Sequence, residues 1–261
     1  MHGAGRGFTI VETLLALAIS GVIFAAGITV LNGRRLDTEY QQAVYDLQSQ
    51  LQSYIDQVSS KVIPGYQQYD CTANTAGTRP QLTTPYTGQT SNCLYLGQAI
   101  ALGVNSDTIT AYPVFGFRTF QDAGGQTMFP STPDEASPEP AVNSAGTALL
   151  VKTYAMSDGL KVVSTSTAAD SHENDLLTFY SSLQSGNISG NEILANAIRT
   201  TSPGWSQVKT CIEDSSSCTL NSLINSSWKL CVSNGARTAQ INVRGTPTGV
   251  ITTVASLTSC S

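Results

Sequence analysis

Charged residues are scarce in this chain. Its 261 residues include 13 lysines and arginines against 18 aspartates and glutamates, so charged side chains make up 12% and the net charge is −5. Soluble globular proteins usually contain about 25% charged residues. Hydrophobic residues still make up 41% of the chain, which is enough to bury a core. The acidic balance argues against a general nucleic-acid-binding protein, because such proteins present clustered lysine and arginine to phosphate.

Histidine and the common catalytic motifs are also missing. The chain has two histidines, too few for a histidine-rich metal site. It contains no Walker motif, no G-x-S-x-G, no H-E-x-x-H and no dinucleotide-binding fingerprint. We therefore expect no catalytic residues, no metal site, no cofactor and no enzymatic activity.

Cysteine is absent from the first 70 residues, and all six cysteines follow. There is no C-x2-C pair, which disfavours the alternative of a zinc site. This distribution is typical of structural disulfides in an oxidising compartment. The acidic pair Glu213 and Asp214 is expected on a surface loop between two of these cysteines, with a cation-binding or adhesive loop as the alternative. Proximity along the chain favours the pairs Cys71–Cys93, Cys211–Cys218 and Cys231–Cys260.

One long apolar run stands near the N-terminus, from Phe8 to Leu31. As a helix it would measure about 36 Å, enough to span a bilayer core of about 30 Å. A secretory signal peptide has a shorter apolar region that ends at small residues. Ala16 and Ala18 form such a pattern, but the run continues past them, so a membrane-spanning helix is favoured. The run contains one carboxylate, Glu12, which at membrane depth costs about 2.5–3.5 kcal/mol and usually has a partner.

The residues around Glu12 form a recognisable pattern. A short polar leader, residues 1–7, ends in Gly7 and is followed by Phe8-Thr9-Ile10-Val11-Glu12 and the apolar helix. This pattern resembles the prepilin processing site of type IV pilins and type II secretion pseudopilins. The resemblance implies that a prepilin peptidase cuts between Gly7 and Phe8 and methylates the new amine of Phe8.

The resemblance also implies partners and a location. Glu12 would pair with the Phe8 ammonium of an adjacent subunit and set the register of a filament, because an unpaired charge is penalised in low dielectric. Before assembly, the alternative partner is the Phe8 amine of the same chain. Other partners would be pilin subunits, the inner-membrane assembly platform and membrane lipid. The chain would cross the cytoplasmic membrane once with its head outside, and then join a surface pilus or a periplasmic pseudopilus. Arg34 and Arg35 follow the apolar run, and the positive-inside rule would place them in the cytoplasm. The proposed orientation is therefore based on the resemblance and on the cysteines.

The helical pattern continues beyond the apolar run. Apolar residues recur at three- or four-residue steps up to Val62, which is the helical period, and Pro64-Gly65 is a stop signal. We expect one helix from Phe8 to Lys61, rather than a separate coiled coil, because sustained heptads with flanking charges are absent. Glutamines occupy its other face: Gln41, Gln42, Gln48, Gln50, Gln52 and Gln57. The expected divisions are a leader (1–7), a transmembrane or filament-core helix (8–33), an amphipathic helix packed on the head (34–62) and an extracytoplasmic β-rich head (63–261).

The head contains many strand-like segments, which begin at Cys93, Thr108, Thr147 and Leu160. Residues 228–233, 238–244 and 249–255 predict a three-stranded meander, since the intervening Asn234-Gly235 is a strong hairpin signal. Short helices are expected at 175–183 and 191–200, and a loop in the proline-rich stretch 130–140. The predicted fold class is therefore α+β and pilin-like: a long N-terminal helix, membrane-spanning in its first half, packed on an antiparallel sheet with disulfides.

Filament assembly is the function that these features predict. The head is large for a major pilin, which favours a minor pilin or pseudopilin, with a major pilin as an alternative. A second alternative is a DNA-binding or host-adhesive pilin, whose DNA contacts would be Lys229, Arg237 and Arg244. The segment around Arg237 departs from the doubled-arginine pattern of such pilins, and edge charges also discourage aggregation. The third alternative is a membrane-anchored envelope protein that is never cleaved.

Overall fold

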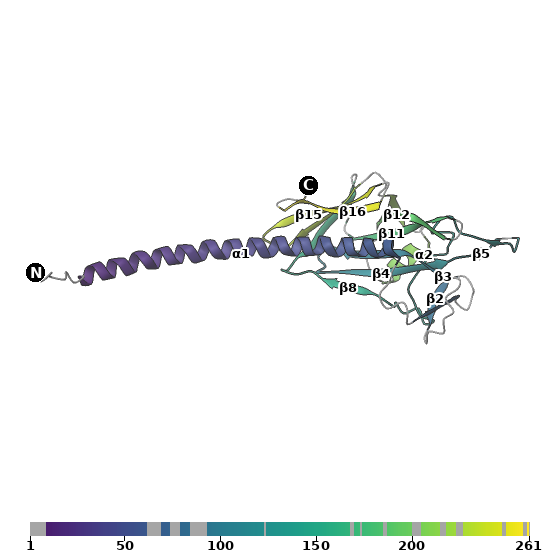
Figure 1. The fold of residues 1–261 in the computed structure, drawn as a ribbon, viewed down its shortest axis with the longest axis horizontal. Helices are drawn as coiled ribbons and strands as arrows, with labels where there is room; N and C mark the ends of the chain where they lie inside the picture. Colours follow the sequence, from purple (N-terminus) through teal and green to yellow (C-terminus); the bar gives the residue numbers. More distant parts are fainter. Residues whose placement is uncertain are drawn as a thin grey trace, which may run out of the picture. The chain divides into compact units, whose positions relative to one another are not determined.

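The computed structural model forms two compact units, Met1–Gln42 and Ala43–Ser261 (Figure 1). Helix α1 (Ile10–Ser60) provides most of the first unit and continues into the second, which confirms the long N-terminal helix. Lys61 follows it with a φ of 59°, a left-handed conformation that often closes a helix. The predicted stop at Pro64-Gly65 lies outside the described residues. The structure describes residues 9–61, 69–73, 79–83, 93–122, 124–167, 170–172, 174–184, 187–199, 205–214, 218–222, 227–246, 249–257 and 260.

A seven-stranded antiparallel sheet is the largest element of the second unit. Its strand order is β13-β12-β11-β3-β4-β7, and β8 also pairs with β4. The central strand β3 is buried along its whole length, so both faces of the sheet are covered. The strands are β3 (Cys93–Gly103), β4 (Thr108–Phe117), β7 (Glu139–Pro140), β8 (Lys152–Ala155), β11 (Asn174–Gln184), β12 (Asn187–Arg199) and β13 (Thr219–Ser222).

A five-stranded antiparallel sheet is built from strands within residues 161–172 and 227–256, and its order is β10-β9-β14-β15-β16. It confirms the predicted meander. The turn that joins β14 to β15 uses Gly235 at a φ of 86°, which favours glycine, and the Asn234 side chain accepts from the backbone N–H of Arg237 at 3.1 Å. The strands are β9 (Lys161–Thr167), β10 (Asp170–His172), β14 (Ser227–Ser233), β15 (Thr238–Thr246) and β16 (Gly249–Ser256).

Two short hairpins complete the strands. Strand β1 (Asp70–Ala73) pairs with β2 (Pro80–Thr83), and β5 (Phe120–Gln121) pairs with β6 (Thr127–Met128). The stretch 130–140 is a loop as predicted, except for β7 at its end. The strand-like segment that begins at Thr147 is a regular strand only in its later part, which is β8.

The helices expected at 175–183 and 191–200 are wrong, since these residues lie in β11 and β12. Residues 176–181 are buried on both faces of the sheet. A strand buried on both faces has no alternation of apolar and polar residues, so its period does not distinguish it from a buried helix. Helix α2 (Trp205–Glu213) forms where the sequence analysis predicts no helix. It includes Glu213, so the expectation that Glu213 lies on a loop is wrong.

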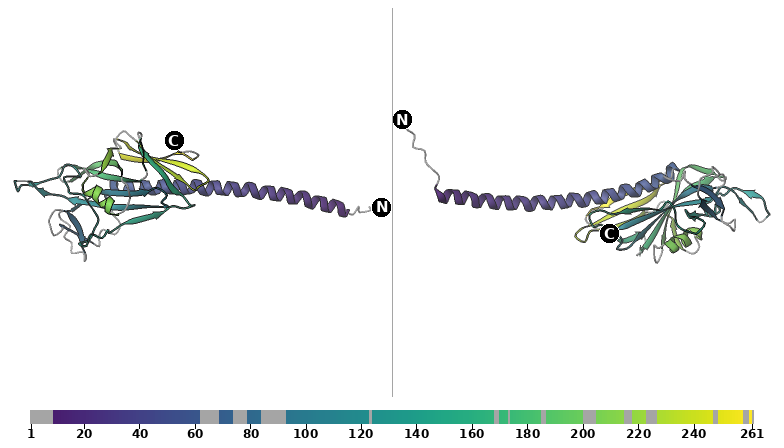
Figure 2. Two further views of the ribbon diagram at one scale, coloured as in Figure 1. Left: turned by 180° about the vertical axis from the view of Figure 1, so that it is seen from behind. Right: turned by 90° about the horizontal axis from the view of Figure 1, so that it is seen from below.

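The hydrophobic core lies on both faces of the seven-stranded sheet. On one face, Val208 and Ile212 of α2 pack with Leu96 and Leu176. The other face receives residues 43–60 of α1, where Ser181 donates its hydroxyl to the Val58 carbonyl at 3.4 Å. Figure 2 shows the two helices on opposite sides of the strands. The α1 side chains that are at most 1% exposed within this segment are Val44, Leu47, Leu51, Tyr54, Ile55 and Val58.

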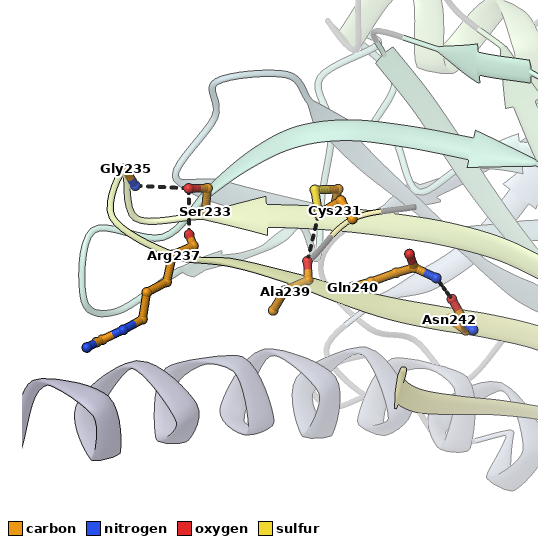
Figure 3. Close-up of a disulfide and its surroundings, with 8 residues drawn as sticks. Cys231, Ser233, Gly235, Arg237, Ala239, Gln240 and Asn242 are labelled. Atoms are coloured by element: carbon orange, nitrogen blue, oxygen red, sulfur yellow. Dashed lines mark hydrogen bonds between the residues drawn. A yellow bond between two sulfur atoms is a disulfide. The ribbon is translucent and has the colours of Figure 1, made fainter. Parts of the chain in front are cut away.

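The three disulfides pair the cysteines as proximity along the chain predicts. Cys71–Cys93 joins β1 to β3, with Cα atoms 5.9 Å apart. Cys211–Cys218 joins α2 to the residue before β13, and Cys231–Cys260 returns the end of the chain to β14 (Figure 3). Each bond restricts the unfolded chain and so stabilises the folded head.

Candidate functional site

The start of α1 is closed by reciprocal hydrogen bonds between Thr9 and Glu12. The backbone N–H and the hydroxyl of Thr9 both donate to Glu12 Oε2 at 3.0 Å. The backbone N–H of Glu12 donates to Thr9 Oγ1 at 3.2 Å. This arrangement is a capping box, in which a threonine before the helix and a glutamate three residues later satisfy each other's donors. The helix therefore begins at Ile10, two residues after the predicted start.

The capping box gives Glu12 a local role that the sequence analysis missed. The signal was present, because T-x-x-E before an apolar run is the sequence signature of this cap. The carboxylate also lies at the positive end of the helix dipole, where negative charge is favourable. The neighbouring residues Gly7 and Phe8, which form the predicted processing site, lie outside the described residues.

The first half of α1 is apolar and exposed. Its most apolar 18-residue window has a mean hydropathy of 2.5 and is 0% buried. Leu17, Val22 and Phe24 each expose at least 70% of their surface. A continuous apolar surface of this size marks a membrane or protein interface, and the helix is long and apolar enough to cross a membrane. The segment therefore suggests membrane anchoring or secretion, and the three disulfides suggest an extracytoplasmic head.

Glutamines of α1 close the open edge of the five-stranded sheet. Gln48 Nε2 donates to the Thr252 carbonyl of β16 at 2.9 Å. Gln52 Oε1 accepts from both the backbone N–H and the hydroxyl of Thr252, each at 3.0 Å. Among the described strands, β16 is the last of its sheet, so its outward backbone groups face no other described strand. The two glutamine side chains take the place of a further strand.

A third glutamine binds the seven-stranded sheet. Gln57 Oε1 accepts from Gln98 Nε2 of β3 at 3.2 Å and from Lys152 Nζ of β8 at 2.7 Å. Burial lowers the pKa of Lys152, so this contact also compensates a partly desolvated ammonium. Residues 43–60 of α1 are thus bonded to strands of both large sheets.

Replacing Gln52 by leucine is expected to lower the free energy of unfolding by about 1–3 kcal/mol, because the buried N–H of Thr252 loses its acceptor, whereas its hydroxyl keeps the Gln48 carbonyl at 3.4 Å. Thr252 is 6% exposed. The measurement is urea unfolding of the full-length chain in neutral detergent, followed by the fluorescence of the buried Trp228. Gln42→Leu, at an exposed position of the same helix, is the control and should leave the midpoint unchanged. Equal midpoints for the two variants would contradict the role of Gln52.

The basic residues predicted as DNA contacts do not form one cluster. Arg244 lies opposite Ser227, and Lys229 lies two residues further along β14 on the same face of the sheet. Arg237 follows the turn at the other end of the hairpin (Figure 3), separated from Arg244 by about 23 Å of extended strand. The fold therefore brings Lys229 and Arg244 together and separates them from Arg237.

A cavity of about 240 Å³ lies between α2 and the sheet. Burial raises the pKa of Tyr180 well above its usual range, so its hydroxyl stays neutral. Thr178 beside it is fully buried. Among the described lining residues, Asp134 is the one charged group. The cavity was not anticipated because α2 was not predicted; its lining is Pro133, Asp134, Thr178, Tyr180, Leu194, Asn196, Ile198, Cys211 and Ile212.

Within the described part of the chain, no group of three or more histidine, cysteine, aspartate or glutamate side chains is placed to hold a metal ion. No family model, curated protein or solved structure matches this chain. The architecture itself is the basis for a functional argument: a long apolar N-terminal helix followed by antiparallel sheets with disulfides, a pilin-like layout.

Proposed function

We propose that this chain is a filament subunit of the type IV pilin or type II pseudopilin kind, and that it serves as a minor subunit. The observation that carries the proposal is the division of α1. Its first half is apolar and exposed, with one carboxylate in its first turn, whereas its second half belongs to the core of a disulfide-bonded head. A helix of this kind can exchange lipid for the equivalent helices of other copies, since both present an apolar surface.

The proposed sequence of events begins with cleavage of the leader after Gly7 and methylation of the Phe8 amine. The apolar half of α1 then anchors the chain in the membrane. On extraction, Glu12 binds the Phe8 ammonium of a neighbouring subunit, and the apolar helices pack together. A head-to-tail contact that does not close on itself produces a helical polymer, so one such interface is enough to build a filament.

The contacts of α1 residues 43–60 support this proposal. Force on a filament helix must reach the head, and the hydrogen bonds of Gln48, Gln52 and Gln57 connect the helix to three strands. Side chains of the same segment are buried in the head core. The helix and the head are therefore a single load-carrying piece over this length.

The test is mass spectrometry of filaments sheared from the surface of the native cell, with quantification of N-terminal peptides. We expect a peptide that begins with methylated Phe8, at low abundance relative to another pilin. The same peptide as the dominant species would make this chain the major subunit. An intact leader that begins at Met1, found in membranes and missing from filaments, would overturn the proposal in favour of an uncleaved envelope protein.

A further inference from the structure

Four charged side chains meet where α2 packs against β7. Lys209 Nζ lies 3.2 Å from Glu139 Oε1 and 3.2 Å from Glu213 Oε1. Arg79, just before β2, places Nη1 3.7 Å from Glu139 Oε2 and donates through Nη2 to the Glu213 carbonyl at 3.0 Å. The Glu139 side chain is 4% exposed, whereas the side chains of Glu213, Arg79 and Lys209 are 22–32% exposed, so Glu139 is the buried member of this ion cluster.

The two carboxylates of the cluster are not fully satisfied by the two cations. Glu139 Oε2 and Glu213 Oε1 are buried, and each has a cation nearby, Arg79 at 3.7 Å and Lys209 at 3.2 Å, but neither oxygen accepts a well-directed hydrogen bond from the described residues. A buried carboxylate oxygen without a donor is costly. A single proton held between two neighbouring carboxyl groups supplies a donor to one and removes a charge from the other, as in carboxylate dyads.

The electrostatics of the cluster agree with a bound proton. Burial, followed by the hydrogen bond and the negative charge of Glu213, raises the pKa of Glu139 to about 7, although Lys209 opposes the shift. The charged groups facing Glu139 are Lys209 and Glu213 on α2 and Arg79 before β2. Strand β4, its other neighbour, places Phe115 opposite Glu139.

We propose that Glu139 and Glu213 share one proton that holds α2 against β7, and that release of this proton to solvent above neutral pH loosens α2. The helix is a wall of the 240 Å³ cavity and carries Cys211 of the Cys211–Cys218 disulfide. Loosening α2 would therefore open the cavity and expose this bond. The proposal does not depend on the filament role.

The direction of the pH dependence follows from linkage. An exposed glutamate has a pKa near 4.5, whereas Glu139 in the closed head titrates near 7. Between these values the closed state binds more protons than the open state, so closing is favoured at the acidic end and is weakened as the pH rises through 7. The opening constant should rise by about tenfold between pH 6 and pH 8.

The experiment is hydrogen–deuterium exchange of the full-length chain in neutral detergent at pH 6, 7 and 8, corrected for intrinsic exchange rates. Protection of the α2 amides should fall by about tenfold from pH 6 to pH 8. Glu139→Gln keeps a side chain that can donate to Glu213 but cannot ionise, so its α2 protection should not change with pH. Glu213→Gln removes the partner carboxylate and should shift the response below pH 6; it also carries the test if Glu139→Gln does not fold.

The matched control is Glu135→Gln, four residues before Glu139. Its carboxylate is fully exposed, and hydrogen bonds from Ser131 lower its pKa, so it stays ionised across this range. The control should keep the wild-type response. The proposal is overturned if wild-type α2 protection is constant from pH 6 to pH 8, or if the response persists in both Glu139→Gln and Glu213→Gln. A carboxyl-carbon NMR titration that places the Glu139 midpoint below pH 5 would overturn it as well.

Discussion

Gly97→Ala is expected to prevent the head from folding. Gly97 lies in β3 opposite Tyr180 of β11, beside a bulge in its pairing with β4. A Cβ at this position would overlap the carbonyl oxygen of Phe179 and lie 2.9 Å from the Cα atom of Tyr180. The obstructing atoms belong to the backbone of the central strand pair, so no side chain can rotate away. The cost should exceed about 4 kcal/mol, beyond most single substitutions and comparable with the 5–15 kcal/mol stability of a typical protein.

The measurement is thermal unfolding of the full-length chain in detergent, followed by circular dichroism of the β signal. Gly27→Ala is the control, because a Cβ there would contact nothing within 4 Å. Alanine is also favoured over glycine inside a helix by about 0.5–1 kcal/mol. The control should unfold at or slightly above the wild-type temperature. A Gly97→Ala head that unfolds within a few degrees of the wild type would show that β3 and β11 can separate without loss of the fold.

Substitution of Glu12 is expected to remove the chain from filaments while leaving it in the membrane, as the proposed function requires. Glu12 has two roles that one variant cannot separate: it caps α1 through Thr9, and it supplies a charge for the Phe8 ammonium of a neighbour. Glu12→Ala removes both. Glu12→Gln keeps the cap, since glutamine also serves in a capping box, but removes the charge.

Both variants should be depleted from sheared filaments by about tenfold or more, because a cation left without its partner in low dielectric is strongly penalised. Quantitative mass spectrometry of the filament and membrane fractions measures this ratio. Glu39→Gln is the control, because Glu39 pairs with Arg35 on the exposed part of the same helix, and such pairs contribute little. If Glu12→Gln assembles like the wild type, Glu12 acts through the cap, and the ion-pair mechanism is excluded.

Much of the architecture could be predicted from local sequence patterns. The helix follows from an apolar run and a sustained 3.6-residue period, and the C-terminal meander from alternation around Asn234-Gly235. The disulfides follow from the spacing of six cysteines that leave no metal-binding motif. Each of these signals lies close together along the chain, so it can be recognised without knowledge of the tertiary structure.

The remainder depended on contacts between distant segments. The sequence pattern of β11 also fits a helix, because residues 176–181 are buried by layers on both faces of the sheet. Gln52 looked like part of a polar helix face until Thr252, 200 positions later, was placed beside it. Glu139 stands in a proline-rich loop sequence, and its burial requires α2 and Arg79. For the candidate site, the pattern around Glu12 was visible in the sequence, whereas the head contacts that fix the helix were not.

The glutamines that meet β16 have a consequence for the behaviour of many copies held close together. An uncovered outer strand is a template on which any other strand can add, and crowding makes such addition fast. Here the covering element is the helix that also attaches the head. A copy whose helix is peeled from its head would stay joined to it through the backbone alone, and it would expose the edge of β16 at the same moment. The hydrogen bonds that help to fix the helix on the head therefore also protect the head from aggregation.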